Sequence, residues 1–78
     1  MNRIKLIWDF RGPNAAPIAA HHIVHLKEFS LAEGLENTIC NTEEITPMHH
    51  IAFMVVDEIH MADLRARLKP NRGQKYNS

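Results

Sequence analysis

The feature that most restricts the fold is the run HHIAFMVV at positions 49–56. Its apolar side chains occupy both sets of alternating positions, whereas a strand with one face in water would alternate apolar and polar residues. This run therefore predicts a central strand that is covered on both faces. Thr46, Pro47 and Met48 predict a turn immediately before it.

Two further segments supply neighbours for this strand. From Arg3 to Arg11 apolar residues recur at every second position, which predicts a strand with one face in a core. From Leu35 to Ile45 the chain is polar, with only a few β-branched residues, and we predict a weak edge strand there.

Two helices connect the predicted strands. The first extends from Asn14, its N-cap, to about Glu33, and Gly34 follows as its C-cap. The stripe predicted to face the sheet consists of Ile18, Ala19, His22, Ile23, Leu26 and Phe29. The second helix takes Asp57 as its N-cap and ends at Pro70.

The order β-α-β-β-α predicts a single α+β domain over residues 1–78, with a short final strand or a mobile tail from about residue 70. It suits a small ferredoxin-like, or split β-α-β, layer with both helices on one face of an antiparallel sheet. The second face would be bare and would present Ala52, Met54 and Val56, or their alternates with Ile7. A second copy of the chain would cover it, so we predict a homodimer.

Cysteine content and hydropathy bear on the location. Cys40 is the only cysteine, so a disulfide framework within one chain is excluded and a reducing compartment is expected. The N-terminal sequence MNRIKLIWDFRG lacks the apolar stretch of a signal peptide, and no apolar run is long enough to span a bilayer. These observations predict a soluble, cytoplasmic protein without a membrane partner.

Charge bears on nucleic acid as a partner. Nine Lys and Arg residues balance nine Asp and Glu residues, so no global field would attract nucleic acid. Basic residues do gather near the C-terminus, at Arg65, Arg67, Lys69, Arg72 and Lys75. Such clustering more often marks a solvated helix end than an RNA contact, so nucleic acid is not the partner we expect.

The six histidines are the compositional anomaly. His21 and His25 are four residues apart on the first predicted helix, and Glu28 lies one turn further along the same side. Two imidazoles and a carboxylate suit Zn, Ni or Cu, and His49 or His50 could add a ligand. Only one of these two could do so, because adjacent residues of a strand point to opposite faces. The alternative is a solvated histidine pair without a metal, which we favour because no H-E-x-x-H or C-x-x-C pattern is present.

Two other residues carry open alternatives. His22 lies inside the apolar stripe, where a core histidine held by one hydrogen bond is the expected arrangement and a pH switch is the functional alternative. Cys40 could act as a nucleophile or a further metal ligand if a histidine lay beside it, but its polar surroundings favour a resting thiol.

No catalytic motif or glycine-rich phosphate loop is present in the sequence. We therefore favour a small non-catalytic binding or regulatory module that acts as a homodimer, with an unidentified small ligand or protein as its partner. The second hypothesis is a metal-binding protein built on the histidine cluster. The third is a small enzyme that uses one histidine as an acid or base in a cleft between subunits.

Overall fold

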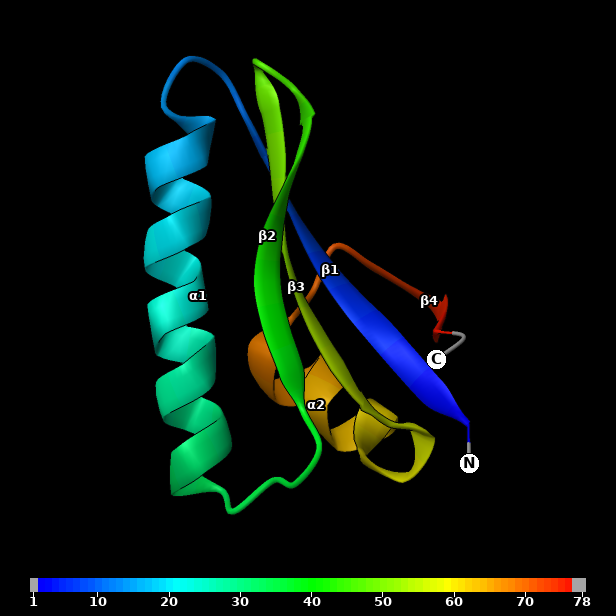
Figure 1. The fold of residues 1–78 in the computed structure, drawn as a ribbon. Coiled ribbons are helices and arrows are strands. Elements are labelled where there is room, and N and C mark those ends of the chain that lie inside the picture. Colours follow the sequence, from blue (N-terminus) through cyan, green and yellow to red (C-terminus); the bar gives the residue numbers. More distant parts are fainter. Residues whose placement is uncertain (1, 77–78) are drawn as a thin grey trace.

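A computed structural model describes residues 2–76 of the chain. Its elements are β1 (Arg3–Arg11), α1 (Ala15–Ala32), β2 (Ile39–Thr46), β3 (His49–Asp57), the 3-10 turn η1 (Glu58–His60), α2 (Met61–Leu68) and β4 (Arg72–Tyr76) (Figure 1). The α+β class is confirmed, with a four-stranded antiparallel sheet and two helices. Of the alternatives for the C-terminal segment, the structure has the short strand, and residues 77–78 lie outside the described part.

The strands lie in the order β2-β3-β1-β4, and every neighbouring pair is antiparallel. The central place of β3 and the edge place of β2 are as predicted. β1 pairs with β3 along its whole length, from Arg3 opposite Asp57 to Arg11 opposite His49. β4 pairs only with the first half of β1. The two most apolar strands therefore form the middle of the sheet.

The main core lies between the sheet and the helices. Its buried members are Ile4, Leu6, Trp8, Ile23, Leu26, Ala52, Met54, Val56 and Leu64. Alternate residues of β1 and β3 point to this side, where α1 covers the sheet (Figure 1). Leu64 is the buried residue of α2. The indole N–H of Trp8 donates to the carbonyl of Leu68 at 3.1 Å, which fixes the end of α2 against β1.

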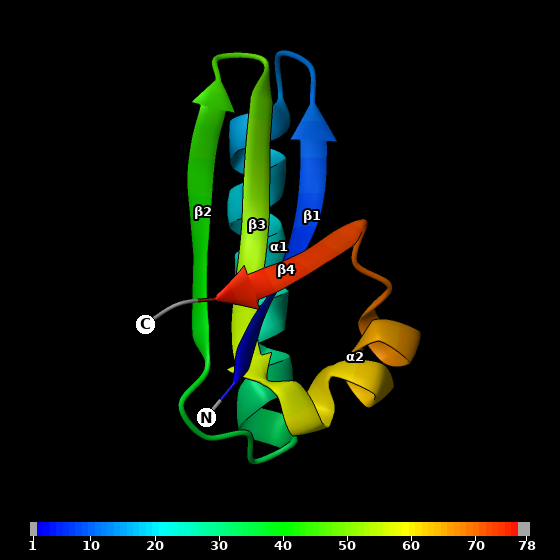
Figure 2. The same ribbon diagram turned by 90° about the vertical axis from the view of Figure 1, so that its right-hand side faces the viewer.

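The second face of the sheet is not bare, which corrects our expectation. Ile7, Ile51 and Val55 point to this side, yet only 2%, 2% and 0% of their surface is exposed. β4 crosses this face in front of β1 and β3 (Figure 2). The ammonium of Lys5 also lies 4.3 Å from the centre of the Phe53 ring. Ile7, Ile51 and Val55, the apolar residues on this side, are therefore already buried within one chain.

The buried line of α1 shares Ala19, Ile23 and Leu26 with the predicted stripe and differs from it at the other positions. Ala15, Ala19, Ile23, Leu26 and Ser30 are buried at intervals of three or four residues. Ile18 lies beside this line and is 48% exposed, so its placement in the core was wrong. His22 and Phe29 are half-buried at the margin of the same line.

Of the predicted helix caps, the structure has the glycine after α1 but lacks the two side-chain caps. Gly34 has a φ of 65° just past α1, the left-handed conformation in which glycine is favoured. Neither Asn14 nor Asp57 makes a side-chain capping hydrogen bond. Asp57 instead lies 3.5 Å from the guanidinium of Arg3, because the two residues are opposite each other in the sheet. No helix in residues 2–76 has the length and apolar character needed to cross a membrane.

Candidate functional site

The histidine pair of α1 lies on the exposed side of the helix. The Nε2 atoms of His21 and His25 are 3.0 Å apart, and their rings are nearly perpendicular. Glu28 Oε1 lies 3.4 Å from Nδ1 of His25, the ring nitrogen that does not face His21. Glu28 is therefore placed to orient the His25 ring, whereas the two Nε2 atoms lie at hydrogen-bond distance from each other.

The two strand histidines have other contacts. His49 Nε2 lies 2.8 Å from Asp9 Oδ1, and His50 Nε2 lies 3.5 Å from Glu44 Oε1. They point to opposite faces of β3, since His49 is opposite Arg11 and His50 is opposite Phe10. Within residues 2–76 no group of three or more His, Cys, Asp or Glu side chains is arranged to hold a metal ion. The five predicted ligands do not converge on one position, and metal binding by the helix pair stays a prediction.

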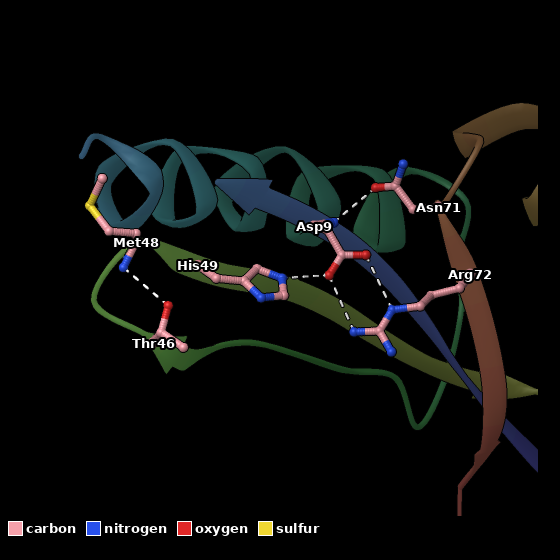
Figure 3. A network of polar contacts seen from close by, with 6 residues as sticks. All are labelled: Asp9, Thr46, Met48, His49, Asn71 and Arg72. Carbon is pink, nitrogen blue, oxygen red and sulfur yellow. Dashed lines mark hydrogen bonds and ion pairs between the residues drawn. The ribbon is translucent and has the colours of Figure 1, made fainter. Parts of the chain in front are cut away.

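A polar network joins three strands on the face away from α1 (Figure 3). Arg72 of β4 donates to both carboxylate oxygens of Asp9, at 3.1 and 3.2 Å. His49 of β3 contacts the same carboxylate at 2.8 Å, and the backbone N–H of Asp9 donates to the side-chain oxygen of Asn71 at 2.8 Å. The hydrogen bond from Arg72 lowers the pKa of Asp9, burial opposes this shift, and His49 lowers the pKa further.

We consider two roles for this network, which are orienting a general base and holding β4 on the sheet. A carboxylate beside an imidazole is the arrangement by which enzymes orient a general base. Here, however, Arg72 occupies both oxygens of Asp9, so the carboxylate serves the ion pair as much as the ring. The network also joins β4 to β1 and β3, and the Asn71 N–H donates to the carbonyl of Ile7 at 2.9 Å just before β4 begins. We therefore assign it the role of holding β4 on the sheet.

Cys40 does not supply a nucleophile to this network. It pairs opposite Met54, whose side chain faces the helices, so the thiol lies on the other side of the sheet from Asp9 and His49. Burial raises the pKa of the Cys40 thiol, and the nearby Lys27 only partly opposes this shift. Since the thiolate is the reactive form, this shift disfavours a reactive Cys40, and the resting thiol stays the prediction.

His22 packs on aromatic rings at the edge of the core. Its ring centre lies 5.0 Å from that of Trp8 and 5.5 Å from that of Phe10. The Nε2 atom is buried, and no hydrogen-bond partner for it exists in the described part of the chain, so the hydrogen bond we expected is missing there. Burial lowers the pKa of His22, and the charges of His25 and His21 lower it further.

No protein-family model, curated protein or solved structure matches this chain. The candidate residues are therefore judged on their geometry. Sequence reasoning found His21, His25 and His22 but assigned no role to Asp9 and treated Arg72 only as part of a basic cluster. An acid within the alternating pattern of Arg3–Arg11 was the one available signal, because a charge in a strand that pairs on both sides needs a partner.

The first prediction uses the position of His22. Because the folded-state pKa is lowered, below about pH 6.5 the unfolded chain takes up a proton that the folded chain binds less readily. The contribution of the neutral ring is therefore complete above that pH and is lost as the pH falls through the folded pKa. His22→Gln should flatten this decline in urea midpoints measured at about pH 7.5, 6.5 and 5.5.

The matched control is His60→Gln, which removes an exposed imidazole that lies outside the aromatic cluster. Subtracting its profile accounts for the general loss of one titrating ring. Equal flattening in the two variants would show that His22 is solvated and would contradict its placement against Trp8 and Phe10.

The second prediction concerns Asp9. Asp9→Asn should destabilise the fold by about 1–2 kcal/mol near neutral pH, because it removes charge-assisted hydrogen bonds. The loss should not be larger, because the donor Arg72 is half exposed to water. Since the Asp9 pKa is lowered, this difference from the parent protein should persist above about pH 4 and vanish as the pH falls through the folded pKa. Backbone amides of β4 should exchange with deuterium faster in the variant.

Glu43→Gln is the control for Asp9→Asn. The Glu43 side chain is 54% exposed and lies 3.8 Å from Lys5, so its loss should change stability by less than about 0.5 kcal/mol. If both variants lowered the free energy of unfolding by the same small amount, Asp9 would not be the residue that holds β4 on the sheet.

Proposed function

We propose that this chain is a small non-catalytic binding or regulatory module that works as a homodimer, joined along β2. The observation that carries the proposal is the free edge of the sheet at β2. Its outer residues include Ile39 and Ile45, which are 38% and 45% exposed. A long edge strand presents unpaired N–H and C=O groups to any second strand that can approach it.

The direction of the backbone groups supports pairing of two β2 strands. The N–H of Thr42 donates to the side-chain oxygen of Asn41 at 2.8 Å, which is consistent with its pointing away from β3. Cys40 and Glu44 have the same orientation, because backbone groups alternate along an antiparallel pair. An antiparallel copy about a two-fold axis at Thr42 would therefore exchange hydrogen bonds at these positions.

Side chains in that register are compatible. A two-fold axis at Thr42 would bring Ile39 close to Ile45 of the partner subunit, at the irregularity between Glu44 and Thr46, and this contact would occur twice by symmetry. β2 contains no proline, lysine or arginine, the residues that commonly block an edge. The carboxylate of Glu43 already lies near Lys5, which reduces repulsion between the two acidic strands.

We also infer that the fold is of the ferredoxin-like, split β-α-β kind. Two observations support this inference. α1 connects β1 to β2, and α2 connects β3 to β4, so each helix links two strands that are not adjacent in the order β2-β3-β1-β4. Leu64 of α2 and Leu26 of α1 also share one core cluster.

The third prediction tests the dimer. Light scattering should give about twice the monomer mass for the parent protein at micromolar concentration. Thr42→Pro should give the monomer mass, because proline removes an outward N–H that does not pair with β3 and edge strands tolerate this residue. Ile45→Lys should act in the same way by placing a charge on the edge.

Ile59→Lys is the matched control, since Ile59 is 84% exposed and lies outside β2. It should leave the mass unchanged, and circular dichroism should show the parent fold for all three variants. A parent protein that stays monomeric at high concentration, or a Thr42→Pro variant that stays dimeric, would refute the interface.

Metal binding is the second candidate function, and it is supported by the approach of the two Nε2 atoms on α1. The proposed ligands are His21 and His25, with Glu28 holding one ring and solvent completing the coordination of Zn, Ni or Cu. The two-ligand site predicts weak binding, since structural zinc sites commonly have four protein ligands.

The fourth prediction tests this candidate. Added Ni²⁺ should raise the melting temperature of the parent protein by mass action, and His21→Ala with His25→Ala should abolish the rise. His60→Ala should retain it. Equal melting temperatures of the double variant and the parent with saturating metal would reject the site.

A further inference from the structure

A cavity of about 440 Å³ lies where α2, the first half of β1 and β4 meet. This volume is within the range of small-molecule sites in proteins. Met61 and Pro70, both half-buried, supply its accessible apolar surface, and Ile4 and Leu6 lie beneath it with 8% and 0% of their surface exposed. Because β4 and β2 are opposite edges of the sheet, the cavity is separate from the proposed dimer interface.

A glycine keeps this space open. Gly73 of β4 lies opposite Leu6 in the sheet and has no positive φ, so its backbone does not require glycine. A Cβ at this position would lie 3.6 Å from Leu6 Cδ2 and 3.7 Å from Ile4 Cγ2, which are ordinary contacts. Neither conformation nor crowding demands the glycine, and its effect is to leave the β4 side of the cavity without a side chain.

The walls of the cavity are cationic. Arg65 of α2 and Lys75 of β4 line it, and neither makes an ion pair within residues 2–76. No aspartate or glutamate of that same segment is among its lining residues. Arg67 differs, because it pairs with Glu33 and Asp63 on the surface. A neutral chain thus concentrates unneutralised positive charge around one apolar cavity.

We propose that this cavity binds a small amphipathic organic anion. Its carboxylate or phosphate group lies between Arg65 and Lys75, and its apolar part lies on Met61 and Pro70. Charge complementarity selects the anion, while the apolar surface selects against inorganic ions and short acids. Gly73 leaves room for the ligand beside β4.

Octanoate is the probe, because it combines a carboxylate with an apolar chain. In ¹H–¹⁵N NMR titrations of the full chain it should cause saturable shifts at Met61, Arg65, Gly73 and Lys75, with a dissociation constant of about 1 mM. Acetate and 1-octanol each have only one of the two features, and both should bind at least about tenfold more weakly.

Substitutions separate the contribution of charge to octanoate binding from that of apolar contact. Arg65→Gln and Lys75→Gln should each weaken octanoate binding about three- to tenfold and leave octanol binding unchanged. Gly73→Val should weaken the binding of both, because the added side chain projects into the cavity. Lys27→Gln on α1 removes a cation from a different surface and should bind octanoate as the parent does. Thr42→Pro should also retain binding, which makes the result independent of the dimer.

Three outcomes would overturn the proposal. Octanoate could shift residues around Leu31 and Ile39 in the groove between α1 and β2 instead. Octanol could bind as tightly as octanoate, or Lys27→Gln could weaken binding as much as Arg65→Gln. Should Gly73→Val fail to fold, the two glutamine variants still decide the question, because both positions are exposed in the free chain.

Discussion

The pairing of β1 with β3 is the constraint on which the rest of the structure depends. The two strands match residue by residue from Arg3 opposite Asp57 to Arg11 opposite His49. This register sends Ile4, Leu6 and Trp8 to one side, where the helices cover them, and Arg3, Lys5, Ile7 and Asp9 to the other. A shift by one residue would exchange the two sets and bury the charges under α1.

The second face of the sheet shows how a short chain covers apolar surface without a second layer of helices. Ile7, Ile51 and Val55 are almost fully buried on this face, where β4 pairs with β1 and the Lys5 ammonium lies over the Phe53 ring. The Arg72 guanidinium and the Asp9 carboxylate join the start of β4 to β1 on the same face.

The same arrangement separates the surfaces on which the proposed functions depend. A covered second face leaves the β2 edge, with Ile39 and Ile45, as the surface that pairing with a second copy would use. At the opposite edge, the short β4 and its glycine leave a cationic cavity beside α2. The histidine pair of α1 lies on a third surface, outside both.

The sequence by itself determined the kind and the approximate limits of the elements. The apolar run at 49–56 predicted a central strand, the alternation of Arg3–Arg11 predicted another, and the position of Gly34 predicted where α1 ends. These features are local, since side-chain period and backbone preference are properties of neighbouring residues. The inward turn of His22 followed from the same periodicity.

Only the tertiary structure decided which distant residues meet. No sequence pattern pairs Asp9 with Arg72, which are 63 positions apart, and none separates His49 and His50 from the helix histidines. The sequence also placed Ile18 in the core, because a helical projection does not show where the sheet beneath the helix ends. Contacts of this kind depend on strand order and on the twist of the sheet. Both are set by the packing of the whole chain, and no local pattern encodes them.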